Sequence, residues 1–182
     1  PFMPESARVL MLGSFPPKRE RWSMEFFYPN FINDMWRIIG LIFFDDKHSF
    51  EIAGKKCFDK ERIVEFCSSR GLALYDAAAE VRRLKDNASD KFLEVVSPTN
   101  LHVMLEQLPE CRAIVTTGEK ASMILSSTFG CELPRVGEYV DIQLFHRTLH
   151  FWRMPSSSRA YPLSLDKKAE QYRKMFTTEG VL

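Results

Sequence analysis

The residues of this sequence best suited to chemistry lie in two loops near opposite ends of the chain. The late loop, Met154 to Arg159, reads Met-Pro-Ser-Ser-Ser-Arg, so hydroxyls and a cation stand between an aromatic-rich segment and an amphipathic one. Hydroxyls and free backbone amides before a helix bind the oxygens of phosphate groups. We therefore expect a phosphate backbone to contact Ser156, Ser157, Ser158 and Arg159, although such residues also serve as ordinary turn and helix-capping residues.

The early loop, Gly13 to Pro17, follows the apolar run Val9 to Leu12. A buried strand that ends in a loop of small residues marks the place where open α/β sheets bind ligands. Cations and aromatic residues alternate after this loop, from Lys18 to Phe31. That mixture is suited to holding a phosphodiester chain and stacking a base, so we expect Arg19 to contact nucleic acid.

Strands that alternate with helices must position these loops. Period-two and buried apolar segments predict strands at Ala7 to Leu12, Leu72 to Tyr75, Arg112 to Thr117, Tyr139 to Phe145 and Leu149 to Arg153. Helical spacing predicts helices at Asp34 to Phe43, Asp59 to Ser69, Thr99 to Gln107, Glu119 to Ser127 and Ser164 to Phe176. The alternation predicts a three-layer α/β/α sandwich with a mainly parallel central sheet. No linker or repeat interrupts it, so we expect one domain over residues 1–182.

Composition limits the class of protein. With 45% hydrophobic and 13% aromatic residues, the chain can bury a sizeable core. A net charge of +1 argues against an avid nonspecific nucleic-acid binder, so contacts to DNA must come from local clusters of cations. No secretory leader or membrane span is visible, which leads us to expect a cytoplasmic protein. We also expect a monomer.

The cysteines and histidines do not form a metal-binding pattern. Cys57, Cys67, Cys111 and Cys131 contain no Cys-x-x-Cys pair, so we expect free thiols rather than an iron-sulfur cluster or disulfides. His146 and His150 are four residues apart, but in a strand that spacing does not bring two side chains to one zinc ion. We expect no metal and no cofactor.

Three motifs, taken in order, resemble the uracil-DNA glycosylase superfamily. They are the glycine loop after the first strand, Asn33 to Trp36 (Asn-Asp-Met-Trp), and the late loop. The late loop is most similar to that of the mismatch-specific uracil- and thymine-DNA glycosylases. Gly71 to Asp76, a polar loop around Lys85 to Asp90, and Ser97 to Leu105 resemble the hypoxanthine-DNA glycosylases. The resemblance spans Val9 to Phe176.

This resemblance implies a monofunctional DNA glycosylase of base excision repair. Such an enzyme flips a deaminated or mismatched base out of DNA and hydrolyses its N-glycosidic bond. Many members hold the attacking water with an Asp or Asn in the early loop, where this chain has Ser14. The hypoxanthine branch implies Asn33 instead, so Asn33 and Ser14 are the catalytic candidates. Asn33 directly precedes a predicted helix, and a helix cap is its alternative role.

Other positions are expected to form the base pocket. Phe27 and Tyr28 are candidates for stacking on the extruded base, with an aromatic core cluster as the alternative. The backbone of the early loop and the end of the second strand would complete the pocket through Gly13, Phe15, Pro16 and Asp76. Arg159 would be the wedge that fills the gap left in the duplex.

Two other functions remain open. The chain could be a DNA-binding module of the same fold that lacks activity. Ser14 stands where an active member would have its water-positioning carboxylate, and such a replacement would remove activity. It could also be a Ser/His hydrolase that pairs Ser14 or a loop serine with His102, His146 or His150, although no Gly-x-Ser-x-Gly elbow is present. Uracil, hypoxanthine and thymine in G:T pairs all remain candidate bases.

Overall fold

A five-stranded sheet forms the centre of the computed structural model, which describes residues 1–84 and 92–182. The strand order is β2 (Leu72–Asp76), β1 (Val9–Gly13), β5 (Ala113–Thr117), β7 (Arg147–Met154) and β6 (Glu138–Leu144). The first four are parallel, and β6 pairs with β7 in the antiparallel direction. The mainly parallel sheet predicted from the sequence is confirmed.

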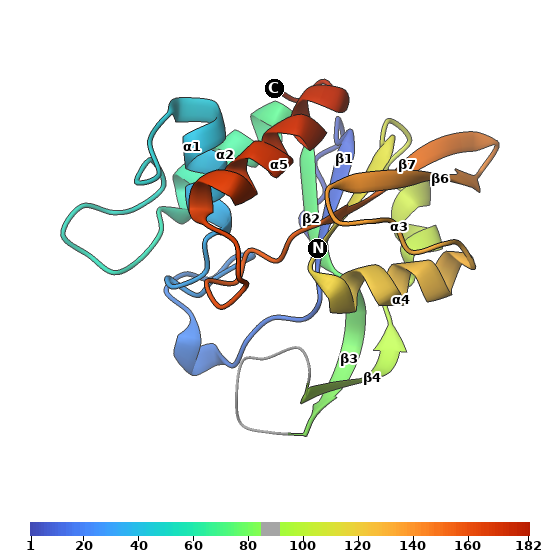
Figure 1. Cartoon of the computed structure of the whole chain (residues 1–182), viewed down its shortest axis with the longest axis horizontal. Coiled ribbons are helices and arrows are strands. Elements are labelled where there is room, and N and C mark those ends of the chain that lie inside the picture. Colours follow the sequence, from blue (N-terminus) through green and yellow to red (C-terminus); the bar gives the residue numbers. More distant parts are fainter. Residues whose placement is uncertain (85–91) are drawn as a thin grey trace.

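Helices cover both faces of this sheet (Figure 1). Side chains alternate along β1, so that Val9 and Met11 face one core while Leu10 and Leu12 face the other. The first core is completed by α1 (Met35–Phe44), α2 (Lys60–Arg70) and α5 (Leu165–Thr178). The second is completed by α3 (Leu101–Glu106) and α4 (Glu119–Phe129). The three-layer α/β/α arrangement is therefore confirmed.

Side-chain caps explain where several helices begin. The side chains of Asp59, Asn100 and Ser164 each accept a hydrogen bond from a backbone amide in the first turn of α2, α3 and α5. Along α5, Ala169, Tyr172 and Phe176 are buried, as their helical spacing predicts. The first turn of α5 is thereby fixed directly beyond the late loop.

A two-stranded antiparallel ribbon was not predicted. It consists of β3 (Ala78–Arg83) and β4 (Leu93–Pro98), and it extends beyond the central sheet in Figure 1. Thr99 Oγ1 donates a 2.6 Å hydrogen bond to the Asp76 carbonyl, which ties the end of the ribbon to the end of β2. The polar loop expected around Lys85 to Asp90 lies outside the described residues. A short 3-10 turn, η1 (Arg19–Arg21), lies in the segment between β1 and α1.

Two of the four cysteines lie in the core. Burial raises the pKa of the Cys67 thiol to about 12 and that of Cys111 to about 11. Cys57 and Cys131 are half-buried free thiols. Within the described ranges, no helix is both long and apolar enough to cross a membrane.

Candidate functional site

The early loop and the end of β2 meet at the carboxyl edge of the parallel sheet. Gly13 pairs in register with Asp76, and its carbonyl accepts a 2.8 Å hydrogen bond from the Ala77 amide. A Cβ atom on Gly13 would lie 2.7 Å from Oδ1 of Asp76, closer than van der Waals contact allows. Gly13 thus allows the Asp76 carboxylate to lie directly over the loop backbone.

Tyr28 connects this edge to β5. Its hydroxyl lies 3.0 Å from Oγ1 of Thr117, which also donates to the Leu12 carbonyl at 3.3 Å, so the tyrosine supplies the proton of the first bond. Burial, together with the charge of Asp76, raises the pKa of Tyr28, so the phenol is neutral at physiological pH. The ring packs edge-on against Trp36 at 6.1 Å. Gly13, Tyr28, Asp76 and Thr117 therefore come together where β1, β2 and β5 end.

Phe27 belongs to an aromatic cluster beside Tyr28. Its ring makes edge contacts with Phe26 at 5.2 Å and Tyr75 at 6.3 Å. Phe27 and Tyr28 both pack against the first core, which is the alternative to base stacking that the sequence left open. Both residues keep part of their surface accessible to solvent, and stacking on a base stays a prediction for them.

The ribbon fixes the early loop from the other side. Arg83 of β3 donates a 2.5 Å hydrogen bond to the Pro16 carbonyl, and its guanidinium lies 5.9 Å from the centre of the Phe15 ring. Sequence analysis missed Arg83 because the ribbon itself was not predicted. Ser14 is buried within this loop, and its hydroxyl has no hydrogen-bonding partner among residues 1–84 and 92–182.

The late loop is shaped by its own serines. The Ser156 hydroxyl accepts from the Ser158 amide at 3.1 Å, and the Ser158 hydroxyl accepts from the Ala160 amide at 3.3 Å. The Ser156 side chain also touches Gly118, where an added Cβ would be 3.4 Å away. The hydroxyls thus perform the ordinary turn role, and their contacts to phosphate remain a prediction.

Asn33 lies against the late loop at the start of α1. It forms a bridge with Ser158, while the neighbouring Asp34 amide donates to the Ser157 carbonyl at 2.9 Å. Oδ1 of Asn33 accepts a 2.9 Å hydrogen bond from the amide of Met35, the first residue of α1, so Asn33 caps the helix from one residue before the N-cap position, Asp34. One lone pair on this oxygen is left for a water molecule.

Asp34, which sequence analysis did not single out, is the buried centre of an ionic cluster. Its Oδ1 accepts from Nε and Nη2 of Arg159 at 3.3 and 3.2 Å, and its Oδ2 lies 3.3 Å from Nζ of Lys168. Lys168 is 1% exposed and also donates to the Ser158 carbonyl at 2.8 Å. Arg37, 7% exposed, donates to the carbonyls of Phe31 and Asn33. We call Asp34, Arg37, Arg159 and Lys168 the Asp34 cluster.

A sequence signal for Lys168 did exist. It stands three residues after Leu165 and four before Tyr172, and is therefore on the buried face of α5. The other predicted cation, Arg19, is exposed. It forms a 2.7 Å ion pair with Glu25 and lies over the Trp22 ring at 4.6 Å.

The histidines do not support a Ser/His hydrolase. His102 packs on Phe129 at the far end of α4, and His146 occupies the β6–β7 turn. His150 is bonded through Nδ1 to the buried Glu179 carboxylate at 2.7 Å. Across the described part of the chain, no histidine makes a hydrogen bond to Ser14 or to the late loop, so the structure shows no Ser/His pair there.

Comparison with solved structures finds a protein with a similar fold. A protein from Methanosarcina acetivorans, described as a "putative uracil DNA glycosylase", superimposes with a TM-score of 0.63 at 20% sequence identity. The match covers 98% of this chain and 94% of that one. No family model matches the sequence, and no curated protein does. The likeness shows a shared fold over nearly the whole chain.

Proposed function

We propose that this chain is a monofunctional DNA glycosylase that hydrolyses the N-glycosidic bond of a deaminated or mismatched base. The observation that carries the proposal is the meeting of Gly13, Tyr28, Asp76 and Thr117 at the carboxyl edge of the sheet, with Asn33 and the late loop beside it. The fold shared with a candidate uracil-DNA glycosylase is consistent with it. A fold alone does not determine an activity, so the proposed activity rests on the residues of the site.

The proposed reaction uses water and no cofactor. The bond between the base nitrogen and C1′ of the deoxyribose breaks first, which leaves the electron pair on the base and positive charge on the sugar. Asn33 Oδ1 accepts a hydrogen bond from the water, whose oxygen then bonds to C1′ and whose second proton passes to solvent. Neutral Asn cannot remove a proton as a carboxylate does, so it acts by orienting the water. The Ser14 hydroxyl is a second candidate for holding it.

We assign recognition of the base to the residues at the carboxyl edge of the sheet. Phe27 and Tyr28 would stack on the base, and Asp76, an acceptor of hydrogen bonds when ionised, would bind an N–H group on its edge. Uracil, hypoxanthine and thymine all carry such a group, so a panel of duplexes with each base must decide between them. Alkaline cleavage of the abasic product reports excision.

Substitution of Asn33 tests the mechanism. We expect Asn33→Ala to lower single-turnover excision by about tenfold or more with DNA affinity nearly unchanged, because the side chain acts on the transition state. Asn33→Asp should keep or raise the rate, since a carboxylate also orients water and can cap a helix. If Asn33→Asp folds with normal stability but is inactive, the water-positioning role is wrong.

A DNA-binding module without activity is the second candidate. It is favoured by Ser14 in the early loop and by the capping bond of Asn33. Tight binding of the duplex panel with no excision of any base, at saturating protein, would establish it.

A further inference from the structure

A basic pocket lies beside the Asp34 cluster. It has a volume of about 370 Å³ and lies between the α1–α2 loop, the late loop and the start of α5. Its lining includes Arg37, Lys47, His48, Arg159 and Ser164. Arg37 of α1, Lys47 of the α1–α2 loop and Arg159 of the late loop thus bring their cations to one hollow.

The charges that line this pocket do not balance. Asp34 is paired with the buried Lys168, and Arg37 is paired with Glu51 at 2.6 Å. Among the lining residues, this leaves the positive charges of Lys47 and Arg159 in excess, even though Arg159 also contacts Asp34. The pocket therefore favours an anion.

Backbone amides add donors to the pocket. Ser164 caps α5 and satisfies the Lys167 amide, but the Leu165 and Asp166 amides precede the first intrahelical bond. The helix has 14 residues, so the positive end of its dipole faces the same hollow as Lys47 and Arg159.

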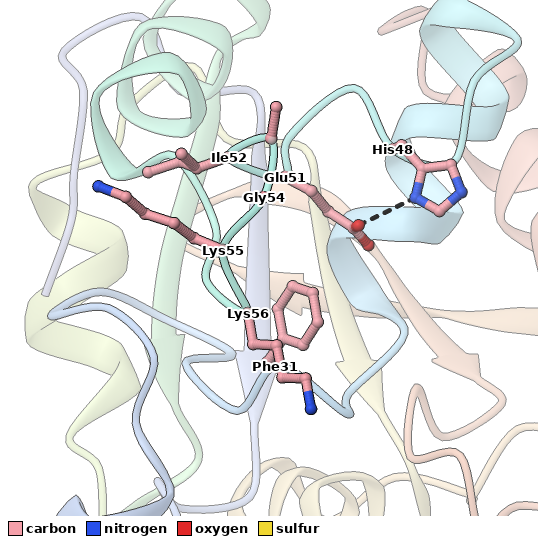
Figure 2. A pocket seen from close by; sticks show the side chains of 8 residues that line it. Phe31, His48, Glu51, Ile52, Gly54, Lys55 and Lys56 are labelled. Atoms are coloured by element: carbon pink, nitrogen blue, oxygen red, sulfur yellow. Dashed lines mark hydrogen bonds and ion pairs between the residues drawn. The ribbon is translucent and has the colours of Figure 1, made fainter.

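The α1–α2 loop is held in place before any ligand arrives. Oδ1 of Asp46 accepts from the His48 amide at 2.8 Å, and the Ser49 hydroxyl donates to the Asp46 carbonyl at 2.8 Å. Nδ1 of His48 is bonded to Glu51 at 2.9 Å. Figure 2 shows this bond from a neighbouring hollow, with the other ring nitrogen of His48 on the far side of the ring. Lys47 is therefore presented by an ordered loop.

We infer that this pocket binds a phosphodiester group of the DNA on which the proposed glycosylase acts. The inference rests on the proposed function for its choice of ligand. Arg159, the predicted wedge, belongs to the Asp34 cluster and also lines this pocket. A phosphate bound in the pocket would therefore belong to DNA that also contacts the late loop. Lys47 and the first amides of α5 then contact the phosphate oxygens.

The test compares Lys47→Ala with Arg135→Ala, a control at an exposed cation in the loop between α4 and β6. Affinity for one fluorescent duplex is measured as salt is raised. We expect Lys47→Ala to reduce the slope of log K against log salt by about 0.9, the value for one phosphate contact. The advantage of the wild type over this variant then shrinks about 3.5-fold between roughly 50 and 200 mM salt. Arg135→Ala should keep the wild-type slope.

An unchanged slope in Lys47→Ala would overturn the inference. Titration of the wild type with inorganic phosphate, followed by amide shifts of Lys47 and Leu165, separates the two sources of phosphate. Submillimolar binding of free phosphate together with an unchanged DNA slope would identify a small-anion site and also overturn the assignment to DNA. Excision is scored separately on the same duplex, so a protein that shows the slope change but releases no base refutes the proposed function and not the pocket.

Discussion

Replacing Lys168 by Met tests whether a buried ion pair fixes the late loop. The Lys168 ammonium is 1% exposed and bridges the Ser158 carbonyl and Oδ2 of Asp34. Met is unbranched and flexible, so it can retain most of the apolar packing of the lysine stem. The substitution therefore removes mainly a charge and two hydrogen bonds.

The magnitude follows from what Asp34 keeps. Removing one partner of a buried ion pair costs about 3–5 kcal/mol, because the other charge stays buried. Asp34 retains Arg159 at Oδ1, so we expect the lower end of this range, about 3 kcal/mol. A chain of this size loses about 2–4 °C of melting temperature per kcal/mol, which gives a fall of about 6–12 °C.

Urea and thermal unfolding of Lys168→Met and Lys167→Met measure this difference. Lys167 is the exposed neighbour on α5, and its substitution should change the free energy of unfolding by less than about 0.5 kcal/mol. Asp34→Asn in combination with Lys168→Met completes a double-mutant cycle, in which the two losses should add to more than the loss in the double variant. A loss in Lys168→Met no larger than in Lys167→Met would refute the argument.

The remaining predictions concern Arg159 and the buried thiols. Arg159→Ala should impair single-turnover excision at least tenfold more on duplex than on single-stranded DNA at saturating protein, because extruding a paired base costs a few kcal/mol; equal defects on both would rule out a wedge. Cys67, with its pKa raised to about 12, should resist iodoacetamide in the folded protein at about pH 8 while the half-buried Cys57 reacts. The raised thiol pKa also means that the folded state keeps a proton that the unfolded state loses, so the free energy of unfolding should fall as pH rises through about 9 to 12. Urea titrations at about pH 7 and 10 on wild type and Cys67→Ala would show a smaller fall in the variant, and the same fall in both would contradict the assignment.

Local sequence pattern was enough to predict the layers of this fold. Val9 to Leu12 is apolar throughout, as expected of a strand covered on both faces, and the spacing in α5 gave its buried stripe and its Ser164 cap. These features depend on residues close together in the chain. Periodicity therefore located the central strands and the helices within a few residues.

Contacts between distant segments could not be predicted in the same way. In β3 only Arg82 lies between two less exposed residues, Val81 and Arg83, and the partners of this strand on β4 follow after a long interruption, so the ribbon gave no short hairpin signal. In the sequence, Asp34 is only the polar first residue of a predicted helix. Its importance depends on Arg159 and Lys168, which lie more than a hundred residues later and reach it only in the folded chain.

The contact between Gly118 and Ser156 limits how independently the loops of this edge can vary. Gly118 has a φ of +94°, which residues with a side chain rarely adopt, and a Cβ added there would be in van der Waals contact with the Ser156 side chain at 3.4 Å. Ser157 and Ser158 are bonded in turn to Asp34 and Lys168. Transplanting a late loop from another protein would therefore disturb three elements at once. A library that varies the late loop should therefore also vary Gly118, Asp34 and Lys168, because these residues contact the loop and a change in the loop alone would not fit them.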